Sequence, residues 1–558
     1  MCISPRVLKK QLLKIVTVVL LLMGAGQAQG AFGDNPSDYS GVKFVKGELV
    51  VWCKDLDARN DSIHGDVLRG GFNVRLKTRL MRWTEAGGWT NTIDRVSVSP
   101  KTGQTTDGAM YGAMVKYNGL ADGRRMVGAC PNIYADMSFL PSDPTFAYPA
   151  AINPLDQNTW YNPYVLNPVV WGLQWNLHNN ASKPISLVPL AIKELYRPNL
   201  AALLANNNTS PILGAAWDPN LTWAYPMLLP AVDGSGSSVA NADIDAPQAW
   251  ETWLQRFPSW IAHPLTVPAS RVSVAVIDSG VYTLHEDLAA NVTPGYDFVT
   301  SRPINSENPG IDLTGHGTAI SGIIAAQTNN GIGMAGIGLG GVAVMPLRVS
   351  GALSDIISSF DYAIARHARV INCSWSYPVP APALQAAIEN AGLNDILVVA
   401  AAGNGGADLI GDNLDYNPIY PAAFAEDNII AVASTDNLDN LSPFSNYGAY
   451  SVHLAAPGQS IYTTWSPSAP YATVIYGTSY NIMGMKYAQE TGTSFAAPHV
   501  AGAAAFLWTL DPGLSYRQVK RALIGGVQYN PSVAGKVSTY GDLNLFKSAV
   551  FVTTNQIP

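Results

Sequence analysis

The chain has 558 residues, more than one ordinary domain needs and enough to bury a large core. Hydrophobic residues make up 47% and charged residues 13%, which is typical of a globular protein and unlike a disordered one. The net charge of -7 gives no reason to expect nucleic acid or an anionic membrane as a partner.

The N-terminus has the pattern of a secretory signal peptide. Basic residues from Arg6 to Lys14 precede an apolar segment, 15–25, that is short for a bilayer span. Small residues follow, and cleavage after Ala28 or Gly30 is expected. We therefore predict a signal peptide at 1–30 and a protein secreted to the periplasm or the medium. An uncleaved anchor is the alternative.

The four cysteines fit an extracytoplasmic protein. Cys2 would leave with the signal peptide, and Cys53 and Cys130 could form a disulfide in an oxidising compartment. Cys373 lies in an apolar run that is typical of a core strand, where a buried and inert thiol is expected. A role for Cys373 as a nucleophile is the weaker interpretation.

Three regions follow the signal peptide. Residues 31–145 form a separate unit, with strand-like segments at 47–53 and 132–136. Residues 146–240 are a Pro- and Asn-rich linker and an insertion without clear periodicity. Residues 241–558 alternate strands and helices, which predicts an α/β domain with a mostly parallel sheet and helices on both faces. The expected strands are 272–277, 344–349, 370–373, 396–401 and 429–433, and the expected helices are 318–326, 355–367, 383–390 and 500–508.

Three polar residues stand where such a fold places reactive groups. Asp278 ends the first strand of the domain, and the carboxyl ends of parallel strands gather active groups. His316 lies between two glycines at a predicted helix start, where it could approach a substrate closely. Ser494 begins another helix, and a helix N-terminus stabilises the negative charge that an attacking serine creates. Each residue alone could be a turn, core or capping residue.

Together these segments resemble the subtilisin-like (subtilase) family of serine proteases, over roughly 240–550. The motifs are Asp278-Ser-Gly-Val, Gly-His316-Gly-Thr and Gly-Thr-Ser494-Phe-Ala-Ala-Pro-His-Val-Ala-Gly. The resemblance implies that Ser494 is the nucleophile, His316 the base and Asp278 its orienting acid. It also implies that Asn404, in an Ala-Gly-Asn-Gly-Gly segment, is an oxyanion donor.

The resemblance places substrate between two segments. One is Ser374, Trp375 and Ser376, where the family usually has Ser-Leu-Gly, so Trp375 and Ser376 are expected to reshape the upper subsites. The other is Ala401, Ala402 and Gly403, whose small side chains predict a roomy apolar pocket and a preference for large apolar residues.

Further family features are implied more weakly. Residues 31–145 resemble a propeptide that would act as folding template and intramolecular inhibitor, although an accessory binding domain is the alternative. Asp287 and Asn330 match positions that hold a structural calcium ion in many relatives. No cofactor is implied for catalysis.

Several look-alike residues are interpreted as structural. His285 and His499 match packed positions of the family rather than bases. Gly477-Thr478-Ser479 repeats the serine tripeptide without the Ala-x-Pro-His that follows Ser494. The long run 467–490 before the serine segment predicts an inserted loop or hairpin near the site.

The sequence thus predicts a secreted zymogen that matures into a serine endopeptidase acting on protein or peptide substrates. Two alternatives remain. One is a non-catalytic subtilisin fold that serves as a binding module. The other is an enzyme that mainly ligates or cyclises peptides, because exclusion of water is not visible in a sequence.

Overall fold

The part of the chain that the computed structural model describes begins at Tyr39. It comprises residues 39, 42–56, 62–121, 125–135, 190–191, 224–225, 244–246, 249–250, 271–328, 330, 332–475, 478–554 and 557. The predicted signal peptide and nearly all of the 146–240 region lie outside these residues. In that region only the paired strands β5 (Leu190–Ala191) and β6 (Ala224–Tyr225) are described.

Contacts divide the chain into two compact units. One comprises Met1–Asn132 with Val379–Ala383, and the other comprises Ile133–Pro378 with Leu384–Pro558. We describe each unit by itself.

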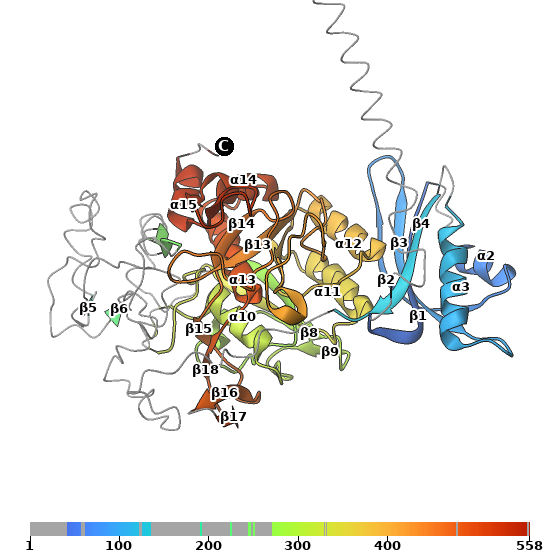
Figure 1. The fold of residues 1–558 in the computed structure, drawn as a ribbon, viewed down its shortest axis with the longest axis horizontal. Helices are drawn as coiled ribbons and strands as arrows, with labels where there is room; N and C mark the ends of the chain where they lie inside the picture. Colours follow the sequence, from blue (N-terminus) through green and yellow to red (C-terminus); the bar gives the residue numbers. More distant parts are fainter. Residues whose placement is uncertain are drawn as a thin grey trace, which may run out of the picture. The chain divides into compact units, whose positions relative to one another are not determined.

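The N-terminal unit is a four-stranded sheet, in the order β2-β3-β1-β4, with two helices on one of its faces (Figure 1). Inward-facing residues such as Leu49, Ile93 and Met110 are fully buried, which gives the unit a core of its own. Its elements are β1 (Phe44–Asp55), α2 (Ile63–Arg69), β2 (Asn73–Thr84), β3 (Thr90–Ser99), α3 (Thr106–Asn118) and β4 (Arg125–Ile133).

No disulfide joins Cys53 and Cys130. The two residues lie in β1 and β4, which are neighbours in the sheet, and both are buried as thiols. Burial raises the pKa of the Cys130 thiol to about 12. Cys373 is likewise a buried thiol, as the sequence predicts.

The second unit is built on a ten-stranded sheet in the order β19-β20-β14-β13-β12-β11-β7-β10-β8-β9. Its central pairs are parallel and its outermost pairs, β8–β9 and β19–β20, are antiparallel. Runs of Val, Ile and Ala, buried on both faces, form the central strands, as expected of a covered parallel sheet. The strands are β7 (Val272–Asp278), β8 (Gly295–Asp297), β9 (Arg302–Ile304), β10 (Val342–Arg348), β11 (Val370–Cys373), β12 (Leu397–Ala401), β13 (Ile429–Thr435), β14 (Leu454–Pro457), β19 (Gln528–Tyr529) and β20 (Gly541–Asp542).

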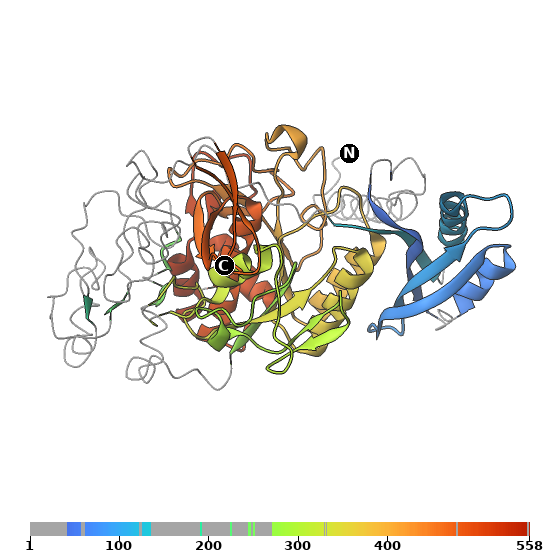
Figure 2. The same cartoon turned by 90° about the horizontal axis from the view of Figure 1, so that it is seen from below.

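Helices cover both sides of this sheet, which confirms the predicted fold class. Figures 1 and 2 show α10 and α13 on one side and α11 and α12 on the other. All residues of α10 and α13 are buried, because these helices pack between the sheet and outer elements. The helices are α10 (His316–Ala325), α11 (Leu353–Ala365), α12 (Pro382–Leu393), α13 (Thr493–Leu510), α14 (Tyr516–Gly525) and α15 (Leu545–Thr553), with short 3-10 turns at Ala289–Asn291 and Gly406–Asp408.

The predicted insertion before the serine segment forms two hairpin-like pairs. Strands β15 (Ile461–Thr464) and β18 (Tyr487–Glu490) pair antiparallel, and β16 (Tyr471–Ile475) pairs with β17 (Thr478–Ile482) between them. Thr478 and Ser479 of the look-alike tripeptide therefore begin strand β17, whereas Thr493 and Ser494 begin helix α13.

Candidate active site

Asp278 lies at the carboxyl end of β7, and its side chain is fully buried. Its Oδ1 accepts a hydrogen bond from the Ser279 N–H at 2.7 Å and contacts His316 Nδ1 at 2.8 Å. The carboxylate thus fixes both the turn after the strand and the orientation of the imidazole. This geometry favours a proton on Nδ1 and leaves Nε2 as the basic nitrogen of the neutral ring.

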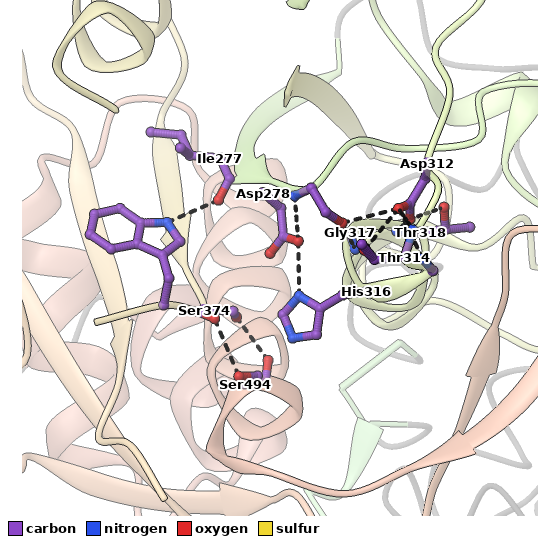
Figure 3. A network of polar contacts seen from close by, with 12 residues as sticks. Ile277, Asp278, Asp312, Thr314, His316, Gly317, Thr318, Ser374 and Ser494 are labelled. Atoms are coloured by element: carbon purple, nitrogen blue, oxygen red, sulfur yellow. Dashed lines mark hydrogen bonds and ion pairs between the residues drawn. The ribbon is translucent and has the colours of Figure 1, made fainter. Parts of the chain in front are cut away.

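His316 is the first residue of α10, after Gly315 with a φ of 88°. Figure 3 shows the imidazole between Asp278 and Ser494. The ring also meets the edge of Phe495, with centroids 5.5 Å apart. Burial alone would lower the pKa of His316, but the Asp278 carboxylate, helped by Asp312, outweighs burial and raises this pKa above its ordinary value.

Asp312, which the sequence motifs did not single out, ties the histidine loop to the helix. Its buried carboxylate accepts from the N–H groups of Gly315 and Thr318, both at 2.9 Å, and from the Thr318 hydroxyl at 2.7 Å (Figure 3). It also accepts from the Ser279 hydroxyl at 3.0 Å, on the turn that follows Asp278. An acidic residue within one turn of a helix N-terminus is favoured by the helix dipole, and its place in the sequence could have pointed to this role.

Ser494 is the second residue of α13, and Gly492 precedes the helix with a φ of 152°, which residues other than glycine rarely adopt. Its hydroxyl donates to the carbonyl oxygen of Ser374 at 3.2 Å, while the Ser374 hydroxyl donates to the Ser494 carbonyl at 2.8 Å. These reciprocal bonds hold the start of α13 against the segment after β11. Rotation about one side-chain bond would redirect the Ser494 hydroxyl.

Asn404 follows β12, and its amide is oriented by the residue before the serine. The Asn404 Oδ1 accepts from both the N–H and the hydroxyl of Thr493, each at 2.9 Å. The Thr493 hydroxyl in turn accepts from the Gly403 N–H at 3.0 Å. Because two donors fix Oδ1, the amide NH2 is the end of the side chain directed away from Thr493, and it can serve as a donor.

The segments expected to bind substrate differ in one respect from the expectation. The Trp375 indole is 2% exposed and donates to the Ile277 carbonyl at 3.0 Å, so its bulk points into the protein. The indole therefore packs against the strand that carries Asp278. These contacts give no reason to expect that the indole reshapes the upper subsites. Ser374 is buried in the bonds to Ser494, and Ser376 is partly exposed.

The predicted apolar pocket is also less open at one point. Ala401 and Ala402 are buried, and Gly403 has a φ of 91°. A Cβ added at Gly403 would lie 2.4 Å from Ile419 Cδ1 and 2.8 Å from Asn446 Nδ2. The Ile419 side chain therefore fills space beside Gly403 that small residues alone would have left open.

The two histidines interpreted as structural are held by backbone groups. His285 Nδ1 accepts from the Asp287 N–H at 3.1 Å, and its Nε2 lies 2.7 Å from the Lys486 carbonyl. His499 Nδ1 lies 2.7 Å from the Phe495 carbonyl within α13. Burial lowers the pKa of each to about 4, so neither ring is arranged as a base for Ser494.

The contacts around Asp287 do not fit a calcium ion. Its carboxylate is surrounded by donors, namely Asn330 Nδ2 at 2.7 Å, the Met334 N–H at 2.9 Å and the Tyr487 hydroxyl at 3.4 Å. Asn330 Oδ1, a potential ligand, accepts instead from the Ile332 N–H at 3.1 Å. Calcium needs several converging oxygens. Within the described residues, no group of three or more His, Cys, Asp or Glu could hold a metal.

Comparisons with known proteins agree with this arrangement. Residues 269–541 match the family described as Subtilase family (Peptidase_S8). The chain is 35% identical over 314 residues to thermitase from Thermoactinomyces vulgaris, which covers 55% of this chain and 94% of thermitase. It is 35% identical over 274 residues to subtilisin Savinase from Lederbergia lenta, covering 48% of this chain and 88% of that protein.

Two further similarities extend beyond the catalytic region. A thermophilic serine proteinase from Bacillus sp. (strain AK1) is 32% identical over 366 residues, which covers 63% of this chain and 77% of that protein. The crystal structure of fervidolysin from Fervidobacterium pennivorans, described as a keratinolytic enzyme related to subtilisin, matches with a TM-score of 0.55. That match covers 91% of this chain and 61% of fervidolysin at 18% identity, so it concerns the fold alone.

Proposed function

We propose that this chain, which belongs to the subtilase family of serine endopeptidases, is a secreted zymogen that hydrolyses peptide bonds with Asp278, His316 and Ser494. The observation that carries the proposal is the buried pair of Asp278 and His316, 2.8 Å apart, beside a serine at the N-terminus of a buried helix. A carboxylate that orients an imidazole next to a serine is the arrangement of acyl-transfer triads.

In the proposed mechanism, the Ser494 hydroxyl turns from the Ser374 carbonyl to His316 and attacks the scissile carbonyl carbon. His316 Nε2 takes the hydroxyl proton and later delivers it to the leaving amine, which gives an acyl-enzyme. Asp278 remains ionised, holds the ring and stabilises its positive charge. Water then attacks the ester in the reverse order of proton transfers and releases the second product.

Asn404 and the N-terminus of α13 would stabilise the oxyanion. Two hydrogen bonds from Thr493 to the Asn404 Oδ1 leave the amide NH2 of Asn404 as a donor. The Ser494 N–H, in the first turn of α13, would be the second donor. The first N–H groups of a helix have no partner within it, and the helix dipole favours negative charge there. Such donors act on the charge that develops during attack.

Residues 31–145 would be an inhibitory propeptide. In support, Tyr134 and Ala135 lie at the start of the second unit and pair within it: Tyr134 forms an antiparallel bridge with Ala352, and the Ala135 N–H donates to the Gly351 carbonyl at 2.7 Å. An extended segment that pairs with an enzyme through backbone bonds can occupy it as a pseudo-substrate. The Ser494→Ala precursor should then accumulate uncleaved, and the active chain should lose this region.

Secretion is proposed from the basic and apolar pattern of residues 1–30. Among the described residues, no helix is both long and apolar enough to cross a bilayer. N-terminal sequencing of the chain recovered from the medium or periplasm tests both processing steps. A mature chain that still begins within residues 1–30 would contradict the proposed signal peptide.

Proteolysis tests the activity itself. The mature chain should hydrolyse casein, and a serine-directed phosphonylating reagent should abolish this activity while it modifies Ser494. We expect no cofactor requirement. Casein hydrolysis that survives full modification of Ser494 would contradict the proposed nucleophile.

A further inference from the structure

Trp465 lies directly after β15 and is one of the largest fully buried side chains, with 1% exposure. The backbone N–H of Trp465 donates to the Lys486 carbonyl at 2.6 Å, so the chain next to β18 fixes the backbone from which the indole projects. Figure 1 shows β15 and β18 beside α10, the helix that begins at His316. Whether Trp465 affects the active site therefore depends on which residues its indole contacts near His316.

The indole packs against Gly315, the residue before His316. A Cβ added at Gly315 would lie 2.3 Å from Cε2 and Cζ2 of Trp465 and 2.6 Å from Cη2. The six-membered part of the ring thus occupies the place that a side chain at 315 would need. Because Gly315 also has a φ of 88°, both its conformation and its lack of a side chain suit this contact.

Hydroxyl groups on either side of Trp465 bind the same helix and loop. The Thr463 hydroxyl donates to the Ala319 carbonyl at 2.6 Å, and the Thr464 hydroxyl donates to the Thr318 carbonyl at 2.7 Å. The Ser466 hydroxyl donates to the Asp312 carbonyl at 2.6 Å. Residues 463–466 therefore form hydrogen bonds both to the loop before His316 and to the first turn of α10.

The inserted segment supports Trp465 from the other side. Tyr471, at the start of β16, is 3% exposed and meets Trp465 edge to face, with centroids 5.6 Å apart and planes at 74°. Its hydroxyl donates to the Gln489 carbonyl at 3.1 Å. A continuous line of contacts thus runs from the insertion through Tyr471 and Trp465 to Gly315. Contacts in close-packed interiors transmit small displacements.

We propose that Trp465, backed by Tyr471, is a positioning residue that holds the backbone of Gly315 and thereby keeps the His316 ring in line between Asp278 and Ser494. The inference rests on the proposed role of His316 as the base. A shift of about 1 Å in a catalytic group can reduce turnover about 100-fold. Loss of the indole should therefore impair the chemical step more than substrate binding.

The test compares Trp465→Leu, Trp465→Phe and Tyr471→Phe in the full precursor after maturation, with Trp508→Phe as matched control. Trp508 is also a fully buried tryptophan, whose indole N–H donates to the Leu514 carbonyl at 2.7 Å, but it lies near the far end of α13. Folded active sites are counted by phosphonylation of Ser494 before kinetics are measured on a peptide substrate.

We expect kcat per active site to fall about 10- to 100-fold in Trp465→Leu, with KM within about twofold, and to recover in part in Trp465→Phe. The acid limb of the pH profile of kcat should move to lower pH, because a ring that leaves Asp278 loses the contact that raises its pKa. Trp508→Phe should change neither quantity, and Tyr471→Phe, which keeps the ring, should have a small effect.

Unchanged kcat and pH profile in Trp465→Leu would overturn the inference, and so would an equal loss in Trp508→Phe. If Trp465→Leu does not mature, Trp465→Phe carries the comparison, and an unaltered kcat there with a lower thermal midpoint indicates a merely structural residue. Failure of the proposed function looks different, because the unmodified chain would then be inactive and unlabelled at Ser494.

Discussion

The chain contains the tripeptide Gly-Thr-Ser twice within a short distance, at 477–479 and at 492–494, and folds it in two ways. Thr478 and Ser479 belong to β17, whose residues pair with β16 in a regular antiparallel register that includes Val474 opposite Ser479. Thr493 and Ser494 begin the buried helix α13. The Thr-Ser pair that the two copies share therefore lies in two different backbone settings.

The difference shows that chemistry depends on what surrounds the serine. In a strand pair, the ladder takes up backbone N–H groups, whereas the first turn of a helix leaves them available for a developing negative charge. The copy at 492–494 also has a neighbouring acid–imidazole pair and an oriented amide, supplied by Asp278, His316 and Asn404. Changes at each of these partners test the contrast in turn.

Replacement of Ser494 by alanine should produce the largest effect, and replacement of Ser479 is its control. We expect Ser494→Ala to lower kcat about a million-fold, the loss that triad removal causes in subtilisin, a relative of this chain. Ser479→Ala should retain normal kcat and KM. Initial rates on a peptide substrate measure both. Equal losses in the two variants would contradict the distinction between the tripeptides.

Replacement of the orienting acid should produce the next largest effect. Asp278→Asn should lower kcat about 10⁴-fold, because the amide favours the wrong imidazole tautomer. The base must be neutral, so activity is lost as pH falls through the pKa of His316. The carboxylate raises this pKa, and its removal should move the acid limb of kcat/KM to lower pH.

The pH profile separates this account from simple loss of structure. Asp355→Asn, which changes an acid that binds the Ser350 hydroxyl at the start of α11, serves as control and should leave the acid limb in place. An acid limb that stays unchanged in Asp278→Asn would mean that the carboxylate does not set the pKa of His316.

Loss of the oxyanion donor should be smaller still. Asn404→Ala should lower kcat about 100- to 1,000-fold with little change in KM, a range drawn from subtilisin itself. Asn440→Ala, which removes an exposed amide bonded to Asp436, is the control. A rise in KM at constant kcat would show instead that Asn404 contributes uniform substrate binding.

Asp287 and Asn330 are a second case in which a residue pattern and its surroundings point to different roles. Removal of calcium is expected to have the smallest effect of the changes considered. The pattern resembles a calcium loop, yet donors surround the carboxylate. A calcium ion at 1,000 times its Kd would contribute about 4 kcal/mol, enough to raise the melting temperature by several degrees. We expect excess chelator to leave the melting temperature nearly unchanged in scanning calorimetry. A drop of several degrees would show that a calcium ion does stabilise the protein.

Local patterns predicted much of this molecule. Alternating apolar runs indicated the central strands and helices, and the residues next to Asp278, His316, Ser494 and Asn404 were distinctive because tight turns and helix starts require particular neighbours. These features depend on a few consecutive residues. The parallel sheet then followed from general rules of chain connection.

Features that depend on distant partners could not be predicted in this way. The inward direction of Trp375 depends on the Ile277 carbonyl, and the filling of space beside Gly403 depends on Ile419. The contact of Trp465 with Gly315 joins residues far apart in the chain. Asp312 is an intermediate case, because its capping role is local but its bond to Ser279 is not.

Mass spectrometry of the mature chain after reaction with a serine-directed phosphonylating reagent tests the central claim most directly. The account predicts one adduct, on Ser494, formed in proportion to the loss of proteolytic activity. It predicts no adduct on Ser479. Modification of Ser479, or loss of activity without modification of Ser494, would contradict it.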